Sequence, residues 1–138
     1  MPTTAERQFA LVLHTDGTFE LIDWPTQDGA TLPLLYSKIA TDRVDVVSIT
    51  SRLDMWLDDE GAGTKPLAEY ATRLYGRYQP IHQPYFGTVV LTGGANQHGD
   101  TLGLTLDQAL ELITRWLDIV HTYRRHAVIP HPTRSPKG

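Results

Sequence analysis

A tight turn near the N-terminus constrains the fold of this chain more than any other feature. Asp16-Gly17 separates two strand-like runs, Phe9–His14 and Thr18–Trp24. An Asp-Gly pair between such runs is the strongest short-range signal for a β-hairpin, because both residues tolerate positive φ. Apolar and polar side chains mix on both faces of the second run, so we expect the hairpin to be covered on two sides.

Helix-like and strand-like runs alternate along the rest of the chain. Helices are predicted over Leu32–Ala40 and Pro66–Tyr78, and strands over Val44–Thr50, Leu53–Leu57 and Phe86–Thr92. Thr31 is the candidate N-cap of the first helix. The last strand is the most apolar, so we expect it to lie at the centre of a sheet.

The final helix has the clearest pattern. Thr105 is its candidate N-cap, and Asp107 lies in the first turn, where the helix dipole favours a negative charge. A broad apolar stripe comprises Leu106, Ala109, Leu110, Ile113, Trp116, Leu117, Val120 and Tyr123. We expect Trp116 to be buried at its centre. The element order β-β-α-β-β-α-β-α predicts an α+β fold with one mainly antiparallel sheet of about five strands.

Composition narrows the classes of function. With 138 residues, of which 41% are hydrophobic, the chain forms one domain with its own core. We expect that domain over residues 9–126, between an N-terminal extension (1–8) and a flexible, basic, proline-containing tail (127–138). The absence of cysteine excludes thiolate catalysis and disulfides. The net charge of −4 makes nucleic acid an unexpected partner. The apolar runs are too short for a signal peptide or a membrane span, so we expect a cytoplasmic protein.

Three acidic residues in the middle of the chain are candidates for a metal site. Asp54, Asp58 and Asp59 lie within six residues of one another. Converging carboxylates bind hard cations, so a metal-dependent hydrolase is one hypothesis. The calcium-loop pattern is missing, and an acidic turn after a strand is usually just solvated. We therefore expect no metal and no other cofactor.

The loop from Gly93 to Asp100 is a candidate ligand-binding segment, and its candidate residues are Gly93, Gly94, Asn96, His98 and Asp100. Glycines let backbone amides approach a ligand. The phosphate-loop motif is absent because no lysine follows. A mobile connection between strand and helix is the ordinary alternative. We expect the loop to be mobile in the free protein and to become ordered on ligand binding.

Aromatic and arginine side chains form a second set of candidate binding residues, namely Trp56, Arg73 and Arg77. Such residues stack on nucleotides and dominate protein–protein contacts. Trp56 faces away from its strand's main apolar side, and Leu112 and Ile119 extend beyond the main stripe of the final helix. These features predict a homodimer. The alternative is that Leu112 and Ile119 pack internally against the N-terminal hairpin.

Several short motifs resemble one known family. They are Leu53–Gly61, Ala71–Leu74, Phe86–Gly94 and Gly99–Thr105. Together they are similar to the domain of unknown function family 3846, over roughly Phe9 to Ile113. Its members are small proteins of actinobacteria, their plasmids and their phages. The resemblance implies a mobile-element setting and no known activity or catalytic residue.

Three hypotheses for function follow, and no catalytic residue can be named. The first is a non-catalytic binding protein, acting on a host protein as an accessory or counter-defence factor of a mobile element. The second is a protein that sequesters a nucleotide or nucleotide signal, a small polar ligand, at the Gly93–Asp100 loop. The third is the hydrolase described above.

Overall fold

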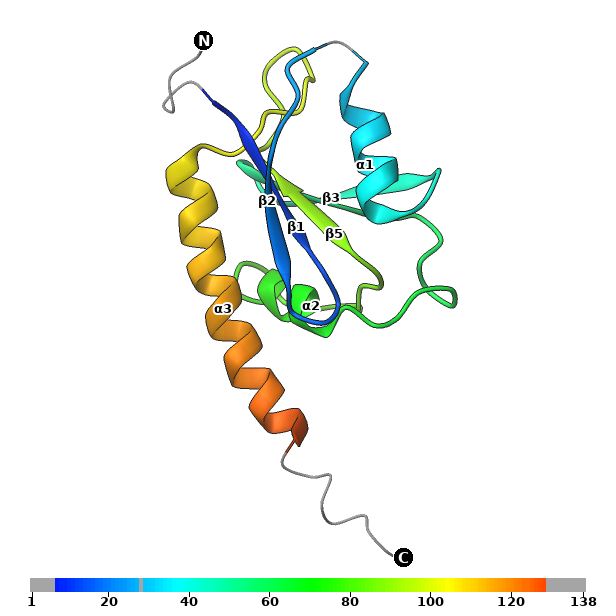
Figure 1. Cartoon of the computed structure of the whole chain (residues 1–138), viewed down its shortest axis with the longest axis vertical. Coiled ribbons are helices and arrows are strands. Elements are labelled where there is room, and N and C mark those ends of the chain that lie inside the picture. The colour runs from blue at the N-terminus through cyan, green and yellow to red at the C-terminus, as the bar shows by residue number, and fades with distance from the viewer. Residues whose placement is uncertain (1–6, 28, 129–138) are drawn as a thin grey trace, which may run out of the picture.

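The computed structural model describes residues 7–27 and 29–128 and shows an α+β fold (Figure 1). The strands are β1 (Phe9–Leu13), β2 (Phe19–Asp23), β3 (Val44–Thr50), β4 (Leu53–Asp58) and β5 (Val89–Thr92). The helices are α1 (Thr31–Ile39), α2 (Glu69–Tyr75) and α3 (Leu106–Val128). The five strands form one antiparallel sheet in the order β2-β1-β5-β4-β3, so the predicted fold, element order and central position of β5 are confirmed.

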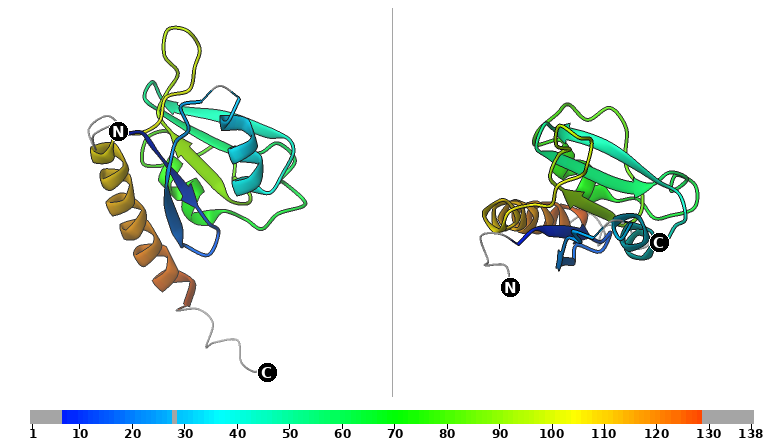
Figure 2. Two further views of the ribbon diagram at one scale, coloured as in Figure 1. Left: turned by 45° about the horizontal axis from the view of Figure 1, so that its top comes forward. Right: turned by 90° about the horizontal axis from the view of Figure 1, so that it is seen from above.

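Helices cover both faces of this sheet (Figure 2). Leu11 and Leu13 of β1 join the larger core, which α2 and α3 cover. Ala10 and Val12 of the same strand join a smaller core beneath α1. All five residues of β1 are buried, which is why this strand is an unbroken apolar run. Its partner β2 is an edge strand and stays partly exposed.

Helix α2 and strand β5 both begin later than predicted, for one shared reason, and α2 also ends at Tyr75 instead of Tyr78. Pro66–Ala68 and Tyr85–Gly87 pair with each other instead of extending the helix and the strand. The Ala68 N–H donates to the Tyr85 carbonyl, and the Gly87 N–H donates to the Pro66 carbonyl, each at 2.8 Å. Gly87 has a φ of 83°, which turns the chain before β5 begins.

The predicted helix caps differ in outcome. The Gln108 N–H donates to Thr105 Oγ1 at 3.1 Å, and the Thr105 N–H donates to Gln108 Oε1 at 2.9 Å. This reciprocal capping box confirms Thr105 as the cap of α3. Thr31 is not a cap, because α1 begins at Thr31 itself and its N-cap residue, Ala30, has no side-chain oxygen to offer.

The predicted core face of α3 is partly wrong. Trp116 is buried as expected, and its indole N–H donates to the Gly17 carbonyl at 2.9 Å. Leu112 and Ile119 are also buried in the larger core, whereas Leu110 and Leu117 are exposed. Apolar residues occupy more than half of the helix circumference, so periodicity alone cannot choose between the two rows. The alternative of internal packing is correct, and these two residues offer no dimer surface.

The structure shows contacts close to both of the expected domain boundaries, which stay a prediction. Gln8 forms hydrogen bonds to two distant segments. Its backbone carbonyl accepts from the backbone N–H of Trp24, and its side-chain Oε1 accepts from the backbone N–H of Gly103. Helix α3 continues through Val128. The rest of the predicted extension (1–6) and tail (129–138) lies outside the described residues. Within the described ranges, no helix combines the length and apolarity that crossing a bilayer requires.

Candidate functional site

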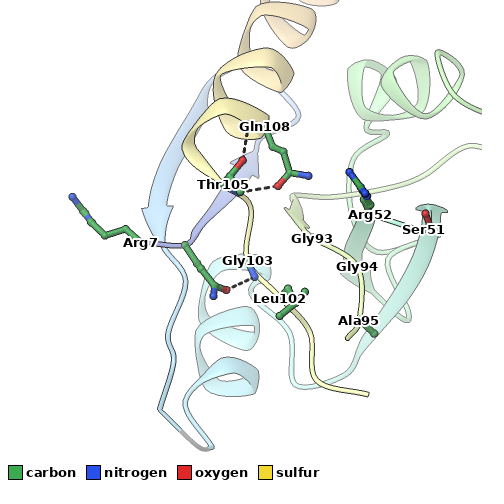
Figure 3. Close-up of a pocket in the computed structure, with 11 residues that line it drawn as sticks. Arg7, Ser51, Arg52, Gly93, Gly94, Ala95, Leu102, Gly103, Thr105 and Gln108 are labelled. Atoms are coloured by element: carbon green, nitrogen blue, oxygen red, sulfur yellow. Dashed lines mark hydrogen bonds between the residues drawn. The ribbon is translucent and has the colours of Figure 1, made fainter. Parts of the chain in front are cut away.

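A cleft of about 690 Å³ opens at the end of the sheet, where β5 ends and α3 begins (Figure 3). Four segments that are distant in sequence build it: the start of β1, the β3–β4 turn, the chain after β5 and the start of α3. The lining residues are Arg7, Gln8, Ser51, Arg52, Gly93, Gly94, Ala95, Leu102, Gly103, Thr105 and Gln108. Its volume lies within the range of small-molecule sites.

The glycines of this cleft are explained first by packing. A Cβ atom on Gly94 would lie 2.1 Å from the Ser51 carbonyl oxygen, and one on Gly93 would lie 2.6 Å from the Gly103 carbonyl oxygen. A Cβ on Gly103 would lie 2.6 Å from Gln8 Cβ. Three backbone segments therefore meet at contact distance, which only glycine permits. The result is a cleft floor made largely of main chain.

The charge of the cleft is positive in a chain that is negative overall. Its eleven lining residues include two arginines and no acidic residue. Arg7 is engaged elsewhere, because its guanidinium pairs with Asp23 at 2.6 Å and points away from the cleft in Figure 3. The Arg52 guanidinium makes no hydrogen bond or ion pair with any described residue. It projects opposite Gln108, beside the positive end of the α3 dipole.

Of the predicted loop residues, only Gly93 and Gly94 line this cleft. The Asn96 side chain closes the loop on itself, accepting hydrogen bonds from the N–H groups of His98 and Asp100 at 2.8 and 3.0 Å. His98 is exposed, and Asp100 lines a neighbouring cleft of about 440 Å³. The expected mobility of this loop stays a prediction.

The predicted aromatic and arginine set lies elsewhere. Helix α2, which carries Arg73, is at the opposite end of the sheet from the Gly93–Asp100 loop (Figure 1). Arg73 of α2 lies over the Tyr123 ring of α3 at 4.6 Å, and Arg77, in the turn after α2, pairs with Asp118 of α3 at 3.2 Å. Trp56 is half-buried under α1 and donates from its indole to Thr92 Oγ1 at 3.0 Å. The structure therefore does not bring these residues to the glycine loop.

The three aspartates do not converge either. Burial would raise the pKa of the Asp58 carboxyl, but hydrogen bonds from the Glu60 N–H, the Thr41 hydroxyl and Lys65 hold it below its ordinary 3.8. Asp59 faces Arg43 at 3.8 Å. Burial raises the pKa of Asp54, against a hydrogen bond with Ser48. Within the described residues, no three metal-ligating side chains of this kind are grouped.

A polar cluster that sequence reasoning missed joins β1, β2 and α1. His14 Nε2 donates to Glu20 at 2.9 Å, so its Nδ1 is free to accept from the Thr88 hydroxyl at 3.2 Å. The order hydroxyl, imidazole, carboxylate is that of a catalytic triad. However, Lys38 also binds Glu20 at 2.9 Å, and the clefts described above exclude all four residues. The hydrogen bonds from Lys38 and then His14 lower the pKa of Glu20. We assign this cluster to structure.

The candidate residue that sequence reasoning missed in the cleft is Arg52. It follows an apolar strand in a short turn, and nothing in its local sequence distinguishes it from other surface arginines. Gln108 was also missed, although the pair Thr105 and Gln108 has the spacing of a capping box. That spacing locates the start of α3 but not the cleft beside it.

Comparison with known proteins places the chain in a family. The model of DUF3846, a domain of unknown function, matches residues 7–118 of the 138. The match extends from the first cleft residue, Arg7, well into α3. No curated protein and no solved structure matches the chain significantly.

Proposed function

The chain belongs to the DUF3846 family, whose description names no activity, and on that premise we propose that it is a non-catalytic protein that binds a small anionic ligand. The cleft at the end of β5 is the proposed site. The observation that carries the proposal is its charge: Arg52, whose guanidinium has no partner among the described residues, lines the cleft, and no acidic residue does, in a chain with a net charge of −4.

The chemistry of the cleft favours a nucleotide or nucleotide signal. The Arg52 guanidinium offers five N–H donors in a planar fork, which suits phosphate oxygens. The start of α3 adds a partial positive charge on the same side. Gly93 and Gly94 line the cleft without a side chain, and the volume of about 690 Å³ lies within the range of small-molecule sites. Sequestering such a ligand is consistent with an accessory or counter-defence role in a mobile element.

A thermal-shift screen tests this proposal. The purified protein is heated with inorganic phosphate, mononucleotides, cyclic nucleotides and dinucleotides, and separately with magnesium or manganese. A binding nucleotide raises the unfolding temperature, because a ligand at one hundred times its Kd stabilises the native state by about 2.7 kcal/mol. A rise with divalent metal alone would instead favour the hydrolase hypothesis.

Matched arginine variants assign the site. Arg52→Ala is expected to abolish the nucleotide shift while leaving the unfolding temperature of the free protein nearly unchanged, because its side chain has no partner to lose among the described residues. Arg43→Ala is the control, since that exposed arginine lies away from the cleft and pairs with Asp59 and Glu60. If Arg52→Ala keeps the full shift, the cleft is not the site.

Binding of a host protein is the second candidate. It is supported by an apolar groove of about 500 Å³ between α2 and the 81–84 segment, where Leu67 and Ile81 are exposed. Aliphatic side chains in such a groove suit an apolar anchor from a partner. Affinity capture from an actinobacterial lysate with wild type and Ile81→Glu tests it. A protein retained equally by both would contradict binding at this groove.

A further inference from the structure

Away from the cleft and the groove, an apolar seam runs along the solvent side of α3. Leu110 and Leu117 are 49% and 51% exposed, and Leu106 and Ile113 are partly exposed beside them. The four residues follow the spacing i, i+4, i+7, i+11, which keeps them on one side of a helix. The helix therefore has a second apolar row after its core-facing row has been buried.

The exposed residues along this seam have a self-complementary order. From the N-terminal end, the exposed residues are Leu110 and Leu117 of the seam itself and, beside the seam, Asp107, Thr114 and His121. If a second α3 is turned end for end about Thr114, Asp107 lies opposite His121, and Leu110 lies within one residue, about 1.5 Å, of the position opposite Leu117. In a parallel pair, by contrast, the Asp107 carboxylate of one chain would face the Asp107 carboxylate of the other. The antiparallel arrangement also places opposite ends of the two helix dipoles together.

We propose that the seam binds a second copy of this chain, with the two α3 helices antiparallel about a twofold axis near Thr114. The contact uses Leu110 and Leu117, not the buried Leu112 and Ile119. A single helix pair buries less than the roughly 1,600 Å² of a standard interface, so the dimer is weak and depends on concentration. The proposal does not depend on the ligand of the cleft.

Cysteine cross-linking tests the orientation, because the chain has no cysteine of its own. Under mild oxidation, Thr114→Cys is expected to form a covalent dimer by itself. Asp107→Cys and His121→Cys are expected to link only when the two variants are mixed. These positions are about 21 Å apart along one helix, and a disulfide needs Cα atoms within about 7 Å. Linking of Asp107→Cys to itself, or no linking by Thr114→Cys, would overturn the antiparallel dimer.

Sedimentation equilibrium tests the surface. Leu110→Glu and Leu117→Glu are each expected to weaken self-association at least about tenfold, because a charge would be buried in the seam. Leu67→Glu is the matched control, since that leucine is also 49% exposed but lies outside α3. Wild type that stays monomeric up to millimolar concentration, or equal weakening by Leu67→Glu, would contradict the proposal. Circular dichroism checks that each variant is folded. If a glutamate variant does not fold, the pattern of cysteine cross-links decides whether the antiparallel dimer forms.

Discussion

Glycine at position 94 shows how a single residue can constrain a site through contact distance alone. The Gly94 backbone lies against the β3–β4 turn, and a Cβ atom would lie 2.1 Å from the Ser51 carbonyl oxygen. That oxygen belongs to the main chain and cannot move without displacing the turn. Because Arg52 is the next residue in that turn, a change at Gly94 would disturb both the stability of the protein and the position of the guanidinium.

We therefore expect Gly94→Ala to lower the free energy of unfolding by about 3 kcal/mol, the upper part of the range for overpacking. Gly63→Ala is the comparison. Gly63 has a φ of 89°, but no other atom lies within 4 Å of the position that its Cβ would take, so only backbone strain of about 1 kcal/mol opposes the change. Urea denaturation of both variants checks this. Equal losses would show that the β3–β4 turn can move away.

At the scale of one strand, β4 carries two aspartates, Asp54 and Asp58, whose carboxyl pKa values are shifted in opposite directions. Asp58 is buried and held by hydrogen bonds, and Lys65 joins it at 3.3 Å while donating to the Ile39 and Ala40 carbonyls at the end of α1. Asp54 is half-buried, and burial raises its pKa. The folded protein is therefore stabilised when the Asp58 carboxyl is ionised, whereas it is more stable when the Asp54 carboxyl is neutral.

This contrast predicts opposite pH effects. The pKa of Asp58 is lower in the folded state, so its stabilisation is fully present above about pH 3.8 and is lost as the pH falls through the folded value. The pKa of Asp54 is raised, so its ionisation opposes folding as the pH rises above 3.8. Asp58→Asn should lower the free energy of unfolding at pH 7, and Asp54→Asn should raise it. Urea denaturation from pH 3 to pH 7 measures both. The same sign for both variants would contradict this assignment.

At the scale of the whole molecule, the two core clusters share the central strands. Val90 of β5 packs beneath α1, whereas Val89 and Leu91 pack toward α2 and α3. Neither face of the sheet can lose its helices without exposing β1 and β5, which are buried throughout. The domain is therefore expected to unfold as one cooperative unit.

The three tryptophans allow that expectation to be measured. Trp24 and Trp56 report on the core beneath α1, and Trp116 reports on the core beneath α3. Fluorescence of Trp116→Phe, and of the double variant Trp24→Phe with Trp56→Phe, should each give the same urea midpoint as the far-ultraviolet circular dichroism of that variant. A fluorescence midpoint that differs from the dichroism midpoint of the same protein would show that one face unfolds first.

Features that depend on neighbours in the chain were predictable from the amino-acid sequence. The Asp16-Gly17 hairpin, the Thr105 cap, the apolar β5 and the order of elements all follow from turn chemistry, capping and periodicity, which act over a few residues. The glycines at 93 and 94 were likewise predicted as candidate residues, and both line the cleft, although their glycine identity is explained by backbone packing.

Features that depend on distant segments needed the tertiary structure. Arg52 reaches the cleft because the β3–β4 turn packs against Gly94, and Gly103 lies there because its N–H donates to Gln8, 95 residues earlier. The core face of α3 is set by Trp116, which binds the hairpin turn 99 residues before it. Sequence periodicity identified two apolar rows on that helix, but only the position of the sheet decided which row is buried, because burial depends on what the rest of the chain places opposite each row.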